Sequence, residues 1–217
     1  MATILSFDEV NKLYEQKRGG NMRSMPFGTF FGEMDLSKVQ KERRIKTAKD
    51  IYPFIVNGIS LLYYMVSEGG FDYDAAVREM RDPYNDLMKK LALVHTSFFE
   101  NHVDNAVAEI INSTLTHQDD LYYFSRDRAA FIAENESSFI WDDADFQTAV
   151  DNGLKRKRWS AILDKRTRDT HIKANGQTVP IDQPFVVGNS LLMFPHDGSL
   201  GADPSELLNC RCSAIYY

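Results

Sequence analysis

The chain has 217 residues, of which 43% are hydrophobic and 26% charged, so it can bury a real core and is not disordered throughout. Its formal net charge of -6 argues against a protein that coats nucleic acid over its whole surface, but it permits a local basic patch. The longest apolar stretch, residues 51–66, is interrupted by polar residues and falls short of the roughly 20 apolar residues of a membrane-spanning helix. We therefore expect a soluble protein made in a reducing cytoplasm, without a signal peptide.

The first 35 residues lack the steady hydrophobic period of a packed helix. Glycine, methionine and phenylalanine are mixed in the stretch MRSMPFGTFFGEM, residues 22–34. Two interpretations stay open. The segment is either an exposed apolar arm that docks on a neighbouring protein or a loop that lies on the protein's own core. We treat residues 1–35 as an N-terminal arm.

A helical pattern of apolar residues follows the arm. Pro53 should bend or restart the first helix, and Gly69–Gly70 should end it. The pair Asp82–Pro83 is typical of a helix start, with proline at the first helical position. The spacing predicts helices over residues 35–68, 72–80, 83–115, 122–135 and 142–153. Residues 36–135 are therefore expected to form a helical region.

The composition changes after Gly153. A basic run and a turn at Asn175–Gly176 are followed by short segments typical of strands, over residues 178–181, 184–187, 191–194 and 212–217. The predicted fold class is α+β. Its N-terminal two-thirds are mainly helical, and a small α+β C-terminal domain, residues 136–217, contains a short antiparallel sheet.

Four consecutive cations precede Trp159, and further cations follow within a short stretch. Contacts with phosphates add salt-sensitive, sequence-independent affinity for DNA, so this run is a candidate DNA surface. The alternative is a solvated helix end, whose cations favour the C-terminal pole of the preceding helix. The candidate DNA-contact residues are Lys155, Arg156, Lys157, Arg158, Lys165 and Arg168.

The chain has two cysteines, Cys210 and Cys212, and they lie one residue apart. On a strand, residues two apart face the same side at about 6.5 Å, which is long for an easy disulfide. With His171, and with His196 or Asp169 as a fourth ligand, the two thiolates could hold zinc in a tetrahedral site. The spacing C-x-C is not the usual C-x2-C, and the alternative is a pair of small buried apolar side chains. Zinc is the only cofactor that we expect.

Enzyme motifs such as GxSxG, GxxxxGK[ST], GxGxxG and HExxH are absent from the sequence. We therefore expect no enzyme, no small-molecule substrate and no membrane partner. The alternative function kept open is a metal-dependent nuclease or a toxin-like effector. Such a protein would arrange Asp164, Asp169, His171 and His196 around a metal ion.

An ordered series of motifs runs through the last third of the chain, residues 136–217. A helix ending in glycine and basic residues is followed by Trp159, by D-x-R-T-R-D-x-H, by N-G-Q, by a strand with proline and phenylalanine, and by a closing N-C-R-C. In this order the motifs resemble the C-terminal domain of the phage Mu F-type minor head proteins, also called phage head morphogenesis proteins. The positions expected to form the core motif of the domain are Trp159, Asp164, Arg166, His171, Gly176, Asn209 and Arg211.

The resemblance implies a structural minor head protein of a tailed phage or prophage particle. Such a protein is made in the host cytoplasm and is incorporated inside the capsid near the portal. The implied partners are the portal protein, other head proteins and packaged double-stranded DNA. The sequence departs from the family where members carry arginine, threonine and glutamate at a helix start, because Ala133–Glu134–Asn135–Glu136 stand there.

Overall fold

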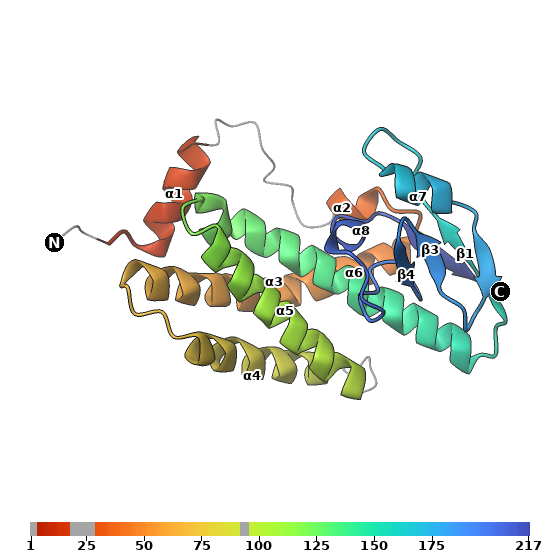
Figure 1. Ribbon diagram of the computed structural model, residues 1–217, viewed down its shortest axis with the longest axis horizontal. Coiled ribbons are helices and arrows are strands. Elements are labelled where there is room, and N and C mark those ends of the chain that lie inside the picture. Colours follow the sequence, from red (N-terminus) through yellow and green to blue (C-terminus); the bar gives the residue numbers. More distant parts are fainter. Residues whose placement is uncertain (1–3, 18–28, 92–95) are drawn as a thin grey trace. The chain divides into compact units, whose positions relative to one another are not determined.

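The computed structural model describes residues 4–17, 29–91 and 96–217 (Figure 1). The chain divides into two compact units, one made of residues 1–24 and 49–133 and the other of residues 25–48 and 134–217. The helices are mostly N-terminal, and the strands lie in the C-terminal part. The predicted α+β class with a small antiparallel C-terminal sheet is therefore confirmed. None of the helices in the described ranges is long and apolar enough to cross a membrane.

Helices build the first unit. Helices α4 and α5 run side by side in Figure 1, and an ion pair joins Arg81 of α4 to Asp104 of α5 at 2.5 Å. Apolar residues three or four apart supply the buried side of each helix. The elements with residues in this unit are α1 (Phe7–Lys17), α3 (Lys38–Ser67), α4 (Tyr73–Leu91), α5 (Thr96–Thr116), the 3-10 helix η1 (Leu121–Phe124) and α6 (Arg126–Asp151).

Pro53, expected at a bend or restart, and Pro83, expected at a helix start, both lie inside helices. Helix α3 continues through Pro53, and α4 continues through Pro83. The predictions of a helix start at Asp82–Pro83 and of one helix over residues 83–115 are therefore wrong. An interior proline costs roughly 3 kcal/mol, and a buried apolar stripe that crosses the proline offsets this cost. In α4 the stripe consists of Ala76, Met80, Tyr84 and Met88.

The two helices predicted over residues 122–135 and 142–153 are joined in one helix, α6, which begins at Arg126 after the 3-10 helix η1. The predicted gap, residues 136–141, is helical. In the structure Ser137 and Ser138 are buried together with Phe139 and Ile140, so the helix has no single polar face there. The Ser137 hydroxyl donates to the Arg44 carbonyl at 2.7 Å, which satisfies its buried polar group.

The second unit contains the sheets. Strand β1 is the centre of an antiparallel three-stranded sheet of order β2-β1-β5, and β3 and β4 form a separate antiparallel ribbon. The last residues of α6 and the first residues of α3 also belong to this unit. Its other elements are α2 (Thr29–Gly32), β1 (Arg156–Ser160), α7 (Asp169–Ala174), β2 (Thr178–Pro180), β3 (Phe185–Val187), β4 (Ser190–Leu192), α8 (Pro204–Leu207) and β5 (Ser213–Tyr216).

The four predicted strands are present, each within about two residues of its predicted range. The prediction missed β1, the central strand, because four cations in a row conceal its alternation. Lys157 and Trp159 point into the unit, whereas Arg156 and Arg158 are exposed. Trp159 joins a buried core with Phe185, at a centroid distance of 5.2 Å. The other members of this core are Ala174, Val187, Leu192, Ala202, Cys210 and Cys212.

The described parts of residues 1–35 pack on the protein's own core, as the second interpretation held, but they include the helices α1 and α2, which that interpretation did not predict. Phe7 and Val10 of α1 are buried in the first unit. Phe30, Phe31 and Met34 are buried in the second unit, beside Ala48. The stretch MRSMPFG, residues 22–28, lies outside the described residues. Because the second unit joins residues 25–48 to residues 134–217, its segments do not coincide with the predicted ranges 1–35, 36–135 and 136–217.

Candidate metal centre and basic sheet face

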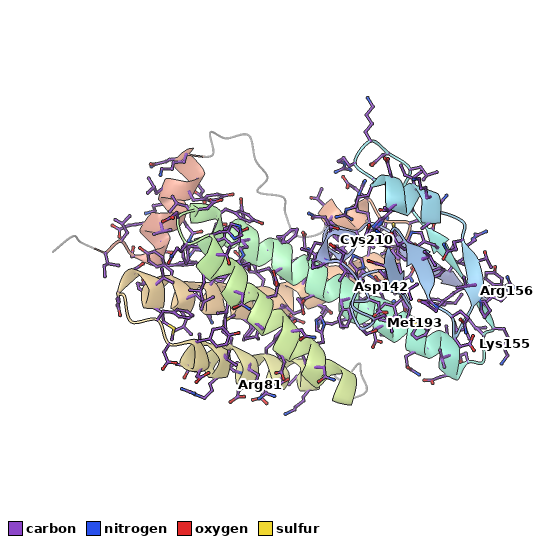
Figure 2. The ribbon with its side chains drawn as sticks, viewed as in Figure 1. Arg81, Asp142, Lys155, Arg156, Met193 and Cys210 are labelled. Atoms are coloured by element: carbon purple, nitrogen blue, oxygen red, sulfur yellow. The ribbon has the colours of Figure 1, made fainter. Side chains whose placement is uncertain are left out.

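Both cysteines and His171 meet inside the second unit. His171 lies on α7, and Cys210 and Cys212 precede β5, where Figure 2 labels Cys210. The His171 Nδ1 atom is 3.3 Å from Cys212 Sγ and 3.6 Å from Cys210 Sγ. All three side chains are buried, and the two thiols do not form a disulfide. The structure therefore brings together three of the four residues predicted to bind a metal.

The other nitrogen of the His171 ring is held by a carboxylate. Nε2 lies 2.9 Å from Glu206 Oε2, and the same oxygen accepts a hydrogen bond from the Thr170 hydroxyl at 2.8 Å. Gly188, at φ +60°, permits this arrangement, because a Cβ atom there would lie 2.7 Å from Glu206 Oε1. Burial, the largest influence, lowers the pKa of His171, but the hydrogen bond and charge of Cys210 outweigh it and raise the pKa. Burial raises the pKa of the Cys210 thiol, and Cys212 adds to the effect.

His196, the fourth predicted ligand, lies elsewhere. Its Nδ1 atom is 2.7 Å from Asp142 Oδ2, and its Nε2 atom is 2.8 Å from the Cys210 carbonyl oxygen. Both ring nitrogens are therefore engaged. Among the described residues, the histidine, cysteine and acidic groups that could share a metal ion are those of His171, Cys210 and Cys212, and neither His196 nor Asp169 belongs to that set.

Asp164 is the centre of an ion-pair cluster built from the core motif. Arg211 donates to both of its carboxylate oxygens, at 2.5 and 2.7 Å, and the Arg166 main chain donates at 2.9 Å. Glu33 pairs with Arg166 at 2.8 Å and with Arg211 at 3.4 Å. The hydrogen bond from Arg211, followed by that from the Arg166 main chain, holds the pKa of Asp164 far below its usual range. The cluster ties the loop before α7 to the segment between the cysteines.

The remaining motif residues have structural positions. Gly176 adopts φ +79° in the turn after α7, where a side chain would be strained. Asn209 adopts φ +57°, and its main-chain nitrogen donates to Asn135 Oδ1 at 2.9 Å. Asn135 belongs to the stretch that departs from the family pattern. In this chain its side chain holds the turn that leads into Cys210.

The candidate DNA-contact residues do not share one environment. Lys155, Arg156 and Arg158 are exposed at β1, and the first two are labelled in Figure 2. Lys157 is buried, and its ammonium donates to the Met193 carbonyl at 2.7 Å. The ammonium also lies 4.7 Å from the centre of the Phe146 ring. Away from the sheet, Lys165 is exposed, and the Arg168 guanidinium donates to the Leu208 carbonyl.

The burial of Lys157 predicts a pH dependence of stability. Burial lowers its pKa to about 8, against the opposing effect of the nearby carboxylates. The unfolded chain keeps the lysine proton up to about pH 10, so it binds more protons than the folded protein between about pH 8 and 10, and this lysine makes stability rise with pH there. We expect the free energy of unfolding of the wild type, relative to Lys157→Met, to rise by about 2 kcal/mol from about pH 7.5 to about pH 10. Urea unfolding of both proteins under reducing conditions tests this, and parallel pH curves would contradict it.

Comparison with known proteins decides the family. The sequence model of the family described as "Phage Mu protein F like protein" matches residues 99–215. The chain belongs to this family. The match includes His171, Cys210 and Cys212, the Asp164–Arg211 ion pair and the basic strand β1. Membership in the Phage Mu F-like family places the chain among phage head morphogenesis proteins.

Curated relatives match over part of their length. The chain is 26% identical over 121 residues to the NAD(+)--arginine ADP-ribosyltransferase EFV of Enterococcus faecalis, covering 55% of this chain and 23% of that protein. It is 30% identical over 125 residues to an uncharacterized protein of Haemophilus influenzae, covering 55% and 25%. It is 28% identical over 138 residues to the uncharacterized protein YqbB of Bacillus subtilis, covering 58% and 45%. The chain thus spans less than half of each relative. No solved structure is significantly similar to it.

Sequence reasoning missed four residues that shape the site. Glu206 contacts and orients His171, and Gly188 leaves room for the Glu206 side chain. Asp142 contacts the His196 ring, and Glu33 pairs with the arginines of the ion-pair cluster. Glu206 is 35 residues from His171 along the chain, and Glu33 is 178 residues from Arg211. No periodicity or short motif connects positions so far apart, and only the fold brings them together.

Proposed function

We propose that this Phage Mu F-like protein is a minor structural protein of a tailed-phage or prophage head, located inside the capsid near the portal. We further propose that it contacts packaged double-stranded DNA through the exposed face of its three-stranded sheet. The family match supports the head role. The observation that carries the DNA contact is the exposure of Arg156 and Arg158 on the same side of the central strand β1.

The strand register shows what surrounds these cations. Arg158 lies opposite Thr178 of β2 and Ile215 of β5. Arg156 exchanges main-chain hydrogen bonds with Tyr217, at 2.8 and 3.0 Å. Because β1 is paired on both sides, its backbone fixes Arg156 and Arg158 on the same face of the sheet. Guanidinium groups bind phosphates in a bidentate manner, which suits a DNA backbone without selecting a sequence.

The net negative charge of the chain is compatible with DNA binding only through a local contact. The whole chain carries a formal net charge of -6, so most of its surface should repel DNA phosphates. A contact restricted to one face gives modest affinity, and its dependence on salt grows with the number of phosphates that it contacts. Such a contact suits a head protein that lies beside tightly packed DNA, where the local phosphate concentration is high.

A double charge neutralisation tests the sheet face. We expect Arg156→Gln with Arg158→Gln to weaken binding to duplex DNA of any sequence. It should also reduce the slope of log K against log salt by about 1.8, since each phosphate contact contributes about 0.9. The measurement is a salt titration of DNA affinity by fluorescence anisotropy.

The matched control is Lys89→Gln with Lys90→Gln. These two exposed lysines of α4 lie in the first unit, and their loss changes the net charge by the same amount. We expect the control slope to equal that of the wild type. Equal slopes for all three proteins would exclude the sheet face as a DNA surface.

The head location is tested with the portal protein of the same phage. We expect the chain to co-migrate with portal oligomers in size-exclusion chromatography at several salt concentrations. Absence of co-migration in all conditions would count against the position near the portal. A plasmid incubated with the protein and magnesium, manganese or zinc should stay intact, whereas cleavage that is lost in His171→Ala would favour the metal-dependent nuclease instead.

A further inference from the structure

Three ligand atoms of the types that zinc prefers converge inside the second unit. His171 Nδ1, Cys210 Sγ and Cys212 Sγ all lie within 4.8 Å of one another. We propose that they bind one zinc ion, that Glu206 orients the histidine as an outer-shell carboxylate, and that the fourth coordination position faces a small pocket. This metal centre is independent of the DNA contact proposed above, and neither proposal depends on the other.

The distances agree with a tetrahedral ion. Zinc–sulfur bonds of about 2.3 Å and zinc–nitrogen bonds of about 2.0 Å place a sulfur and a nitrogen ligand about 3.5 Å apart. The two measured separations from His171 Nδ1 are 3.3 Å to Cys212 and 3.6 Å to Cys210. An ion therefore fits between the three atoms with little rearrangement of the backbone. Two thiolates and an imidazole favour zinc over magnesium or calcium, which prefer oxygen ligands.

The contact with Glu206 selects the tautomer that a metal needs. With its proton on Nε2, His171 donates to the Glu206 carboxylate at 2.9 Å, and the lone pair of Nδ1 points at the two sulfur atoms. A carboxylate behind a ligating histidine is the usual outer shell of a protein zinc site. A cysteine pair that only filled the core would not need the imidazole fixed in this direction.

One sulfur also receives a main-chain donor. The Cys212 N–H group donates to Cys210 Sγ at 3.4 Å. A hydrogen bond of this kind stabilises negative charge on a thiolate ligand. The C-x-C spacing, which is unusual for a zinc knuckle, here brings the second cysteine's amide to the first cysteine's sulfur.

The fourth position is open to a pocket that all three ligand residues border. Its other lining residues are Ile162, Arg166, Thr167, Arg168, Asn209 and Arg211. His196 does not fill this position, because both of its ring nitrogens are engaged with Asp142 and Cys210. Three protein ligands with an open fourth position are known for zinc, and a water molecule or a small anion completes the tetrahedron.

The first test uses the full-length wild-type protein. We expect elemental mass spectrometry to find about one zinc per chain after dialysis against a weak chelator. The two thiols should resist a thiol-reactive dye until a strong chelator removes the metal. Cobalt substitution should produce an intense sulfur-to-cobalt charge-transfer band, and added azide should shift the visible bands if the fourth position is open.

Variants then locate the ion. We expect Glu206→Gln to weaken zinc affinity by about 10- to 100-fold, as outer-shell changes do, and Cys212→Ser to abolish the charge-transfer band. The control is His117→Gln, an exposed histidine of the first unit, which should bind zinc as the wild type does. Circular dichroism checks that each variant is folded.

Two results would overturn the proposal. The first is a folded wild-type protein that neither contains zinc nor takes up added zinc or cobalt. The second is a zinc affinity that stays unchanged in folded Cys212→Ser, which would place the ion elsewhere. Cobalt bands that azide does not shift would contradict the open position, because a fourth protein ligand would then fill it.

Discussion

Asp142→Ala is expected to lower the free energy of unfolding of the second unit by about 3–5 kcal/mol. The Arg44 guanidinium is fully buried and pairs with Asp142 Oδ1 at 2.5 Å, with Asp145 farther away at 3.6 Å. The other Asp142 oxygen holds His196. Within the described residues, Arg44 Nε and Nη1 have no hydrogen-bond partner, so Asp142 is the main compensation for this buried charge. Its loss leaves a buried cation whose remaining counter-ion is Asp145, at 3.6 Å.

Urea unfolding followed by tryptophan fluorescence measures this effect. Trp141 and Trp159 both belong to the second unit, so the signal reports on the part of the chain that the mutation affects. The control is Asp151→Ala, an exposed aspartate at the end of the same helix, which should change stability by less than about 0.5 kcal/mol. A cost for Asp142→Ala that is no larger than this would show that water or another group compensates Arg44.

Trp159→Ala is expected to lower the free energy of unfolding of the second unit by about 3–5 kcal/mol. The indole is completely buried at the centre of the sheet. Its ring packs edge-on against Phe185 at 5.2 Å and against His171 at 5.8 Å. Truncation removes a large apolar area and leaves a cavity that the paired strands on both sides of β1 prevent from closing.

This variant removes one of the fluorophores, so far-UV circular dichroism in urea is the suitable measurement. Trp159→Phe is expected to cost less than the alanine variant. It keeps an aromatic ring in the core and also removes the indole N–H, which has no hydrogen-bond partner in the described structure. Leu163→Ala, at a side chain 63% exposed, serves as the neutral control. A small cost for Trp159→Ala would mean that the core around it collapses freely.

Local patterns were enough to predict most of the strands and the α+β class. The segments that became β2 to β5 carry apolar and β-branched residues between turn signals, and these signals act within a few residues. The central strand β1 was missed because buried Lys157 occupies a position where a sequence pattern expects an apolar side chain. The carbonyl of Met193 and the Phe146 ring, which accept its ammonium, are distant in sequence.

Helix boundaries were predicted less well for a related reason. Proline and polar serine are local signals of a break, yet burial on both sides of Pro83 and around Ser137 outweighed them. The sequence analysis grouped His171 with Cys210 and Cys212, although the cysteines lie in one motif and the histidine in another. His196 was predicted as the fourth ligand because the sequence could not show that its ring contacts Asp142 instead.

The discontinuous composition of the second unit bears on how such genes can be shuffled. Arg44 and Asp142 are 98 residues apart, and Glu33 and Arg211 are 178 residues apart, yet both pairs belong to this unit. A recombination event that exchanged only residues 134–217 between two phages would combine the Asp142 position of one chain with the Arg44 position of the other. We therefore expect hybrid chains to fold only when residues 25–48 are exchanged together with the C-terminal segment, or when the two segments already carry complementary side chains. These two stretches form one unit of inheritance, although residues 49–133 separate them along the chain.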